Sequence, residues 1–394
     1  MAPRPPTTSD SPVPIYLDHH ATTPLDERVL EAMDPYLRAD FGNAASRTHV
    51  YGWRAEAAVE EARESVAAGL GAEAREIIFT SGATEANNIA LLGSARARRG
   101  HDRTGIVTVA TEHPAVLDPA RALEAEGFRV DVLPVASNGL VDLEALRAAV
   151  DENTAVVSVM AANNEIGVLQ PLAEIAAISR EAGAWFHSDA AQAAGRIDLR
   201  VDRDPIDLLS ISGHKLYGPK GVGVLYLRAT RPRVRPHPIL YGGGHERGLR
   251  SGTLPVAQCV GLARAFELCL EEREAETKRL EELRDALWSR IESELSGVRC
   301  NGVGAPRLAG NLNVAIEGVD ADKLLLALPE FALSTGSACS SARPEPSHVL
   351  AALGLPDGLA RASLRFGLGR STTAADLKFA GDRLIEAVRM QRGE

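Results

Sequence analysis

Lysine is scarce in this chain, so chemistry that needs a lysine amine has few candidates. Among 394 residues there are five lysines, and Lys215 comes three residues after the apolar run 206–212, within the stretch SGHKLYGPKG. An amine placed between a histidine and a glycine-rich turn at a strand end can condense with an aldehyde cofactor as a Schiff base. The alternative is a polar turn whose lysine meets solvent.

A carboxylate follows a second apolar run in the same way. Asp189 ends AWFHSD (184–189), which has the pattern of a buried strand. A buried carboxylate is costly unless it has a cationic or hydrogen-bonding partner. A protonated pyridine nitrogen would be such a partner, and Gln192 could then reach another ring substituent. The alternative is that Asp189 caps a helix, which is a common role for aspartate.

Three further apolar runs are also followed by polar residues. Thr84 opens a predicted helix after residues 76–80, and the N–H groups there could bind a phosphate-sized anion. Such hydroxyl caps are also frequent without any ligand. His113 could lie against a planar ring or be structural, and Asn164 adds an amide after another run.

The secondary structure predicted around these residues places them at one common location. Short β-branched runs alternate with helical patterns, which predicts a mostly parallel sheet flanked by helices. The predicted strands are 76–80, 105–110, 128–133, 155–160, 184–189, 206–212 and 222–227, and the predicted helices are 84–98, 114–126, 141–150 and 171–182. Ligands of such sheets bind beyond the carboxyl ends of the strands, where all of these polar residues fall.

The pattern changes after residue 252. A long helix is predicted from about 255 to 295, with Pro255 at its start, and shorter strand-like and helix-like pieces follow it. We therefore expect a disordered leader over 1–14, a large cofactor-binding domain over 15–264, and a small α+β domain over 265–394. The small domain would carry the loop around Cys339.

Composition excludes several classes of function. The net charge of −10 gives no general surface for nucleic acid or anionic lipid, and no apolar run reaches the roughly 18 residues that cross a bilayer. The leader lacks the apolar core of a signal peptide. Four cysteines form no disulfide framework and no metal-binding CxxC pattern. We therefore expect a cytoplasmic protein without direct membrane or nucleic-acid contact and without a metal site of its own.

Longer motifs then identify a relationship. The stretches concerned are YLDHHATTP (16–24), FGNAASRTH (41–49), IIFTSGATEANN (77–88), TEHPAVL (111–117), NNEIGV (163–168), HSDAAQ (187–192), SGHKLYGPKG (212–221), GGGHERGLRSGT (242–253), STGSACSSA (334–342) and SLRFGLGR (363–370). In these motifs the chain resembles cysteine desulfurases of the NifS/IscS group, in the class V aminotransferase branch of fold-type I pyridoxal-phosphate enzymes. The resemblance implies an α/β fold with a mostly parallel seven-stranded sheet and a smaller α+β C-terminal domain.

The resemblance also implies a role for each residue of the site. Pyridoxal 5′-phosphate would be attached to Lys215, which also moves protons. Asp189 would pair with the ring nitrogen, Gln192 would bond the phenolic oxygen, and His113 would stack on the ring and take part in proton transfer. Asn164 would contact cofactor and substrate. The phosphate would be held by Ala83, Thr84, Ser212, His214 and, across a homodimer interface, Thr253 of the partner subunit.

The remaining implied roles concern the substrate and the sulfur. Arg365 would bind the carboxylate of L-cysteine in a bidentate manner. Cys339 would be the nucleophile, since its small polar neighbours suit an exposed loop. Its thiolate would take the substrate sulfur as a persulfide, leaving L-alanine, and pass it to an acceptor such as an iron–sulfur scaffold or a tRNA-thiolation enzyme. With a scaffold partner, Cys339 could transiently ligate an iron–sulfur cluster. Cys259 and Cys269 fit an apolar helix instead.

Some features carry no assigned role or leave alternatives. His19, His20 and Cys300 receive no catalytic role. The chain stops at Glu394 without the extension by which some relatives dock a scaffold, so docking of a scaffold is left open while desulfuration is still expected. Alternatives are a selenocysteine lyase or another class V aminotransferase-like enzyme. A catalytically silent paralogue that acts as a binding module would be expected to lack Lys215 or Cys339, and the chain keeps both.

Overall fold

The structure is a computed structural model, and it describes residues 13–230, 233–335 and 346–394. The helices are α1 Glu27–Arg38, α2 Val50–Leu70, α3 Ala83–Asn88, α4 Ser94–Arg99, α5 Pro114–Ala125, α6 Leu143–Ala149, α7 Leu172–Glu181, α8 Val256–Glu294, α9 Ala321–Ala327, α10 His348–Ala352, α11 Asp357–Arg361 and α12 Ala374–Arg392. The strands are β1 Ile15–Tyr16, β2 Ile77–Thr80, β3 Gly105–Val109, β4 Arg129–Leu133, β5 Thr154–Ser158, β6 Trp185–Asp189, β7 Leu208–Ser212, β8 Gly223–Leu227, β9 Val298–Cys300, β10 Asn311–Ile316, β11 Phe331–Ala332 and β12 Ser363–Gly367.

The large sheet has seven strands in the order β2-β8-β7-β6-β5-β3-β4. β8 runs antiparallel to both of its neighbours, and the other pairs are parallel. All seven predicted strands are present, each displaced by at most two residues at an end. The predicted mostly parallel seven-stranded sheet is therefore confirmed.

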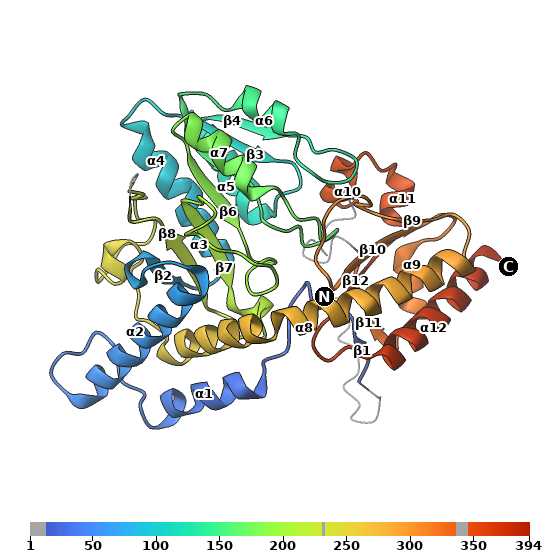
Figure 1. Ribbon diagram of the computed structural model, residues 1–394, viewed down its shortest axis with the longest axis horizontal. Coiled ribbons are helices and arrows are strands. Elements are labelled where there is room, and N and C mark those ends of the chain that lie inside the picture. Colours follow the sequence, from blue (N-terminus) through green and yellow to red (C-terminus); the bar gives the residue numbers. More distant parts are fainter. Residues whose placement is uncertain (1–12, 231–232, 336–345) are drawn as a thin grey trace, which may run out of the picture.

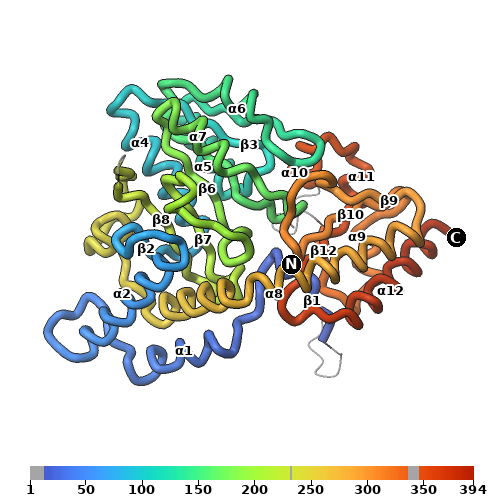
Figure 2. The backbone as a smooth tube through the Cα atoms, in the orientation of Figure 1, coloured from blue at the N-terminus to red at the C-terminus, as the bar shows by residue number. Residues whose placement is uncertain are grey.

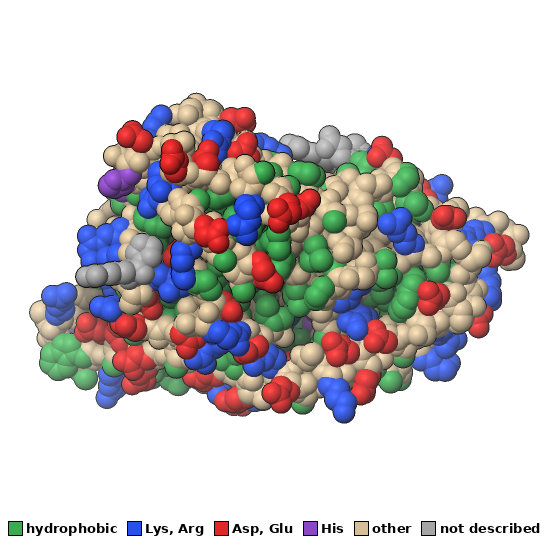
Figure 3. Space-filling view, turned by 45° about the horizontal axis from the view of Figure 1, so that its top comes forward, with side chains coloured by type: hydrophobic (Ala, Val, Ile, Leu, Met, Phe, Trp, Pro, Cys, Tyr) green, Lys and Arg blue, Asp and Glu red, His purple; other side chains and the backbone are tan. Residues whose placement is uncertain are grey.

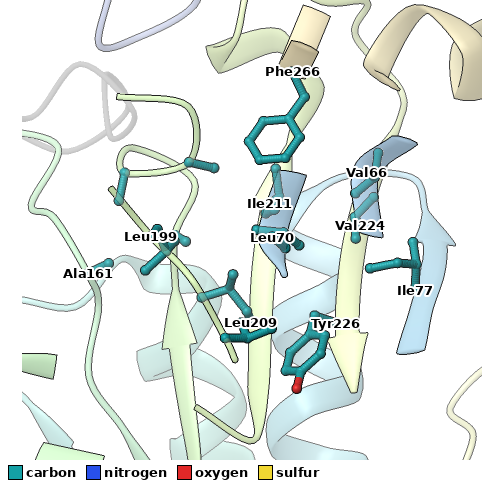
Figure 4. Close-up of a cluster of buried hydrophobic side chains, with 14 of the residues drawn as sticks. Val66, Leu70, Ile77, Ala161, Leu199, Leu209, Ile211, Val224, Tyr226 and Phe266 are labelled. Carbon is teal, nitrogen blue, oxygen red and sulfur yellow. The ribbon is translucent and has the colours of Figure 1, made fainter. Parts of the chain in front are cut away.

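Helices cover both faces of this sheet (Figure 1). Successive strand residues point to opposite faces, so Leu209 packs in one core with α2, α7 and α8. Its neighbour Leu208 packs on the other face with α3, α4 and α5. Figure 4 shows the first of these cores, where Leu209, Ile211 and Val224 of the sheet lie near Leu70 of α2 and Phe266 of α8. Burial on both faces explains why the strands read as continuous apolar runs.

One predicted helix is irregular in the structure. Residues 84–98 were expected to form a single helix, but a π-helical turn over Ile89–Gly93 separates α3 from α4. The carbonyl of Gly93 accepts a hydrogen bond from the N–H of His237 at 2.9 Å. A distant segment thus takes an acceptor that the regular helix would use, and the widened turn accommodates it.

The long helix α8 runs from the large sheet to the smaller unit (Figure 2), and its side chains belong to two hydrophobic cores. Its first part, including Phe266 and Cys269, packs against the large sheet. Leu280 and later residues pack with a second core around the antiparallel sheet β12-β10-β9. β1 pairs with β11, so the N-terminal strand contributes to this smaller unit although the sequence placed residues 15–264 together.

The surface carries charges of both signs. Acidic and basic side chains are interspersed over the face drawn in Figure 3. In the described part of the chain, no helix is long and apolar enough to cross a membrane. The same residues contain no group of three or more His, Cys, Asp or Glu that could hold a metal ion.

Candidate active site

A cavity of about 530 Å³ opens at the carboxyl edge of the large sheet. Its walls come from the ends of several strands and from β12 of the smaller unit. Ten residues predicted from the sequence line it together: Ala83, Thr84, His113, Asn164, Asp189, Gln192, Ser212, His214, Lys215 and Arg365. The convergence expected at one edge of the sheet is therefore present.

Asp189 is fixed by two hydrogen bonds at the end of β6. Its Oδ1 accepts from the N–H of Ala191 at 2.9 Å, and its Oδ2 accepts from Asn87 Nδ2 at 2.6 Å. The first bond closes a turn after β6, and no helix begins between Asp189 and β7, so the helix-capping alternative is not what the structure shows. Asn87 was not assigned from the sequence. The available signal was its position three residues after Thr84, which places both on one side of a helix.

Lys215 lies in a 3-10 turn, Gly213–Lys215, directly after β7. Its Nζ donates a hydrogen bond to the carbonyl oxygen of His20. The turn is held by Tyr217, a non-glycine residue with φ of +61°. Its N–H donates to Thr23 Oγ1 at 2.7 Å, and its carbonyl accepts from the N–H of Asp26 at 3.0 Å. Such a strained backbone persists only where its surroundings hold it, so the lysine belongs to a constrained wall of the cavity.

His113 is both a helix cap and a cavity residue. It is the N-cap of α5, where its Nδ1 accepts from the N–H of Ala115 at 3.0 Å. Burial lowers the pKa of His113, opposed by nearby Asp189 and reinforced by Lys215. The ring is therefore neutral near pH 7 with its proton on Nε2, because Nδ1 is the acceptor.

One end of the cavity is rich in hydrogen-bond donors. Thr84 lies in the first turn of α3, which Gly82 precedes with a φ of +152°, a conformation that side-chain-bearing residues rarely adopt. Ser212, His214 and Lys220 line the same cavity. Burial, followed by the charges of the two nearby lysines, lowers the pKa of His214 to about 4. This end suits an anionic group such as a phosphate.

Thr253 does not line this cavity, in contrast to the other predicted cofactor residues. Its side chain is exposed at the end of the segment 242–253. That segment is nevertheless attached close to the donor-rich end, because Arg250 pairs with Glu85 at 2.7 Å. Glu85 also accepts a hydrogen bond from the N–H of Ser81 at 2.6 Å.

Arg365 forms the opposite wall of the cavity from β12. It is 2% exposed, and its Nη2 lies 2.6 Å from Asp18 Oδ1. Its Nη1 donates to the carbonyl oxygen of Asn164 at 3.0 Å. Among the described residues, its Nε has no hydrogen-bond partner. A buried guanidinium with an unused donor that borders a cavity is suited to a carboxylate ligand.

His20, for which no role was predicted, lines the cavity as well. Its Nδ1 lies 3.1 Å from Gln192 Oε1, and its carbonyl oxygen accepts from Gln192 Nε2 at 2.8 Å. Burial lowers the pKa of His20 well below its usual value, so the ring is neutral. His20 therefore fixes the orientation of the Gln192 amide, a contact between distant segments that no local pattern signals.

The three cysteines that the structure describes differ in their surroundings. Cys339 lies outside the described residues. Burial raises the pKa of Cys259 to about 12 and that of Cys269 to about 11, so both are neutral thiols in the apolar core. Cys300 is half-buried, with Arg307 Nη1 at 2.9 Å from its Sγ.

Known proteins resemble this chain over nearly its whole length. The sequence matches the aminotransferase class V family over residues 15–379. It is 52% identical to cysteine desulfurase IscS of Rickettsia bellii (strain OSU 85-389), over 93% of this chain and 89% of the relative. The chain belongs to the class V aminotransferase family, in its cysteine desulfurase group.

Two further comparisons agree with this assignment. The chain is 52% identical to the mitochondrial cysteine desulfurase of Drosophila melanogaster, over 96% of this chain and 82% of the relative. A solved structure titled as a NifS-like protein superimposes with a TM-score of 0.88 at 35% identity, covering 96% of this chain and all of the other. The predicted resemblance and the predicted fold are confirmed. Membership of this family also implies pyridoxal phosphate as the cofactor.

Proposed function

We propose that the chain transfers the sulfur of L-cysteine to Cys339 with pyridoxal phosphate attached to Lys215. The net change is L-cysteine plus the Cys339 thiol giving L-alanine plus a Cys339 persulfide. The observation that carries the proposal is the single cavity shared by Lys215, Asp189 and Arg365, which supplies an amine, a carboxylate and a guanidinium. The cysteine desulfurases that the chain resembles support the choice of substrate.

The residues present fit the cofactor at each of its polar groups. Asp189 offers a hydrogen-bonded carboxylate to a pyridinium nitrogen, and Lys215 supplies the amine for the aldehyde. The N–H groups near Thr84, with Ser212 and Lys220, surround the donor-rich end where a phosphate would bind. When bound, pyridoxal phosphate supplies an electron-withdrawing ring that weakens bonds at the α and β carbons of an amino acid.

The chain's own residues divide the remaining tasks. Asp189 would hold a proton on the ring nitrogen, and Asn87 and the N–H of Ala191 would keep its two oxygens in place. Lys215 Nζ would move protons at the substrate carbons, since it is the amine in the cavity. Neutral His113 would accept or donate a proton through Nε2 while Nδ1 remains bonded in the helix cap.

Cys339 would act after these proton transfers as the nucleophile. Its sulfur forms a bond to the sulfur of cysteine as the carbon–sulfur bond of the substrate breaks. A Cys339→Ala holoenzyme should keep its cofactor absorbance and its response to cysteine, because the lysine and the thiol serve separate steps. It should form no persulfide, as measured by alkylation and mass spectrometry. Normal production of alanine and sulfide by this variant would move the nucleophile elsewhere.

We also propose a homodimer in which Thr253 completes the phosphate site of the partner subunit. Two observations support this: Thr253 is exposed away from its own cavity, and its segment is rich in glycines. The aromatic side chains of Phe41, after α1, and of Tyr51 and Trp53, in the first turn of α2, are 68%, 45% and 55% exposed, and a second copy could cover them. Sedimentation of the holoenzyme should give a mass near twice 41.9 kDa. A fully active monomer would refute the shared site.

The destination of the sulfur is the last part of the proposal. A persulfide on Cys339 would be passed to an acceptor protein in the cytoplasm, for iron–sulfur assembly or tRNA thiolation. Capture of interacting proteins with the persulfide-loaded enzyme, compared with the Cys339→Ala variant, would identify the acceptor. Acceptors bound equally by both forms would not be sulfur-dependent partners.

A further inference from the structure

Arg196 lies behind the wall of the cavity without lining the cavity itself. Its Nη1 lies 3.1 Å from His20 Nδ1 and 3.4 Å from Gln192 Oε1. Its Nη2 donates to the carbonyl oxygens of Lys215 at 3.0 Å and of His19 at 3.4 Å. One guanidinium thus contacts residues from three segments of the chain that meet at the cavity.

The turn after β6 places Arg196 beside Gln192. The N–H of Ala194 donates to the carbonyl of Ala190 at 2.9 Å, and the N–H of Arg196 donates to that of Ala193 at 2.9 Å. In such a helical turn, residues four positions apart lie on the same side. The Arg196 guanidinium can therefore reach the Gln192 amide from behind the wall.

The contacts of the His20 ring determine which of its nitrogens carries the proton. Nε2 lies 3.3 Å from the carbonyl oxygen of Gly310, which can only accept. The guanidinium of Arg196, which can only donate, lies at Nδ1. Both contacts are satisfied when Nε2 is protonated and Nδ1 accepts. Burial lowers the pKa of this ring, and the positive charges of Arg196, Arg365 and Lys215 lower it further, so the ring stays neutral.

These contacts favour one orientation of the Gln192 amide. Its Oε1 lies on the side of Arg196 Nη1, and its Nε2 donates to the carbonyl oxygen of His20 at 2.8 Å. A flipped amide would place its N–H groups against the guanidinium and its oxygen against the carbonyl. Since Nε2 carries two N–H groups and the bond to His20 uses one, the other can be donated to a ligand in the cavity that Gln192 lines.

Arg196 also explains a contact that would otherwise be repulsive. His20 Nδ1 and Gln192 Oε1 lie 3.1 Å apart, and both are acceptors in this state. Two acceptors at that distance repel each other unless they share a donor, and Arg196 Nη1 faces both of them. An amide whose oxygen accepts from a guanidinium is also polarised, which makes its N–H groups stronger donors.

We propose that Arg196 and His20 are positioning residues, which hold the Gln192 amide so that it donates an N–H group to the phenolic oxygen of the cofactor. This inference rests on the proposed function, in which pyridoxal phosphate is attached to Lys215. The phenolic oxygen carries negative charge in the attached cofactor, so an amide turned the other way would present its own oxygen to that charge.

The protonation of the attached cofactor reports this contact without any turnover. In the holoenzyme, the nitrogen that joins Lys215 to the cofactor shares its proton with the phenolic oxygen, and the absorbance changes when that proton leaves. The oxygen then keeps its full charge, so a donated N–H group favours the deprotonated form. Spectrophotometric pH titration without cysteine measures the midpoint. The variants of Arg196 leave in place the other ionisable side chains that line the cavity: His20, Glu85, His113, Asp189, His214, Lys220 and Arg365.

Loss of the guanidinium should raise this midpoint. Arg196→Met should raise it by about one pH unit, as expected when a hydrogen bond to a charged group is weakened or lost. Arg196→Gln replaces Arg196→Met if that variant does not fold. Arg196→Lys keeps a cationic donor and should return the midpoint most of the way to the wild-type value. An unchanged midpoint without the guanidinium would overturn the proposal.

A double-mutant cycle tests whether Arg196 acts through Gln192. The guanidinium also contacts the carbonyl oxygen of Lys215, and its charge acts on the cofactor at a distance. Gln192→Leu removes the amide and should raise the midpoint by itself. Arg196→Met should add little in that background. Strictly additive shifts would mean that Arg196 acts on the cofactor directly, and the positioning role would be wrong.

The chain offers a matched control in the adjacent histidine. His19 and His20 are both 0% exposed, but His19 does not line the cavity, and its Nδ1 lies 3.0 Å from the carbonyl oxygen of Gly367. His20→Leu should raise the midpoint, by less than Arg196→Met, because the guanidinium remains. His19→Leu should leave it unchanged. Equal shifts in the two histidine variants would show a general disturbance of this segment and would contradict the role of His20.

The wild-type protein tests the underlying function separately. If borohydride reduction and peptide mapping found no cofactor on Lys215, the proposed function itself would fail. If the cofactor were attached there and the Arg196 variants titrated like the wild type, only the positioning role would fail.

Discussion

The cavity has two walls that are built in different ways. On the sheet wall, Asp189 is the last residue of β6 and Lys215 lies in the turn after β7, so the hydrogen-bonded ladder of the large sheet places both. The opposite wall depends on the ion pair between Asp18 and Arg365, residues 347 positions apart, at the junction with the smaller unit. Both walls are carried by strands, the sheet wall by the large sheet and the opposite wall by β12 of the smaller unit, where Arg365 pairs with Asn313 of β10. We expect changes in the sheet wall to affect the cofactor and changes in the opposite wall to affect the substrate.

The largest effect should come from the lysine of the sheet wall. Lys215→Ala should abolish covalent cofactor attachment and all measurable alanine production, because no other amine occupies that position. Borohydride reduction followed by peptide mapping measures the attachment. Lys220→Ala, which removes the other lysine that lines the cavity, should keep it. Label found on Lys220 in the wild type would contradict the assignment.

The opposite wall should respond in substrate binding alone. Arg365→Lys should raise the Michaelis constant for cysteine by a factor that corresponds to about 1–3 kcal/mol of lost binding free energy. The reason is that an ammonium cannot reproduce a bidentate guanidinium contact. The cofactor absorbance should not change. Arg121→Lys, at an exposed arginine of α5, is the control and should behave as wild type. Equal loss of cofactor in the Arg365 variant would remove the distinction between the two walls.

The carboxyl group of Glu165 lies near the charge of Arg365 in the opposite wall, and its ionisation should change the free energy of unfolding with pH. Burial raises the pKa of Glu165 from 4.5 to about 7. Between pH 4.5 and pH 7, the folded protein therefore keeps a proton on this carboxyl group that the unfolded chain has lost. The stability from this proton is fully present below pH 4.5 and is lost as pH rises through 7. The unfolding free energy of Glu165→Gln minus that of the wild type should therefore be about 2 kcal/mol larger at pH 8 than at pH 5.

Urea titrations of both proteins at the two pH values measure this difference, and the remaining titrating groups cancel in the comparison. A constant difference between variant and wild type would mean that Glu165 ionises normally in the folded protein.

The smallest effect expected is at a residue that supports the sheet wall. Asn87→Ala removes the donor that lies 2.6 Å from Asp189 Oδ2. Cofactor affinity should fall about tenfold, because the carboxylate loses one of its two fixed bonds. Absorbance titration with pyridoxal phosphate measures this, and the Michaelis constant at saturating cofactor should change little. An unaltered affinity would show that the bond to Ala191 is sufficient.

Much of the fold followed from local patterns in the sequence. The seven strands of the large sheet were predictable because strands buried on both faces need long runs of apolar residues. The long helix was predictable because the residues from about 255 to 295 have a helical pattern and Pro255 stands at its start. The π-helical turn over Ile89–Gly93 was not predictable, because it depends on an N–H group of His237 that lies far along the chain.

The sheet wall of the site was also determined by the sequence. When polar residues follow successive parallel strands, their shared edge brings His113, Asp189 and Lys215 together without any long-range information. The tertiary structure alone decided the pairs His20 with Gln192, Asn87 with Asp189 and Asp18 with Arg365. A hydrogen bond forms only when two atoms lie about 3 Å apart. For Asn87 with Asp189 that distance is set by how α3 packs on the large sheet, and for Asp18 with Arg365 by how the N-terminal segment packs beside β12. Neither local propensity nor spacing encodes such packing.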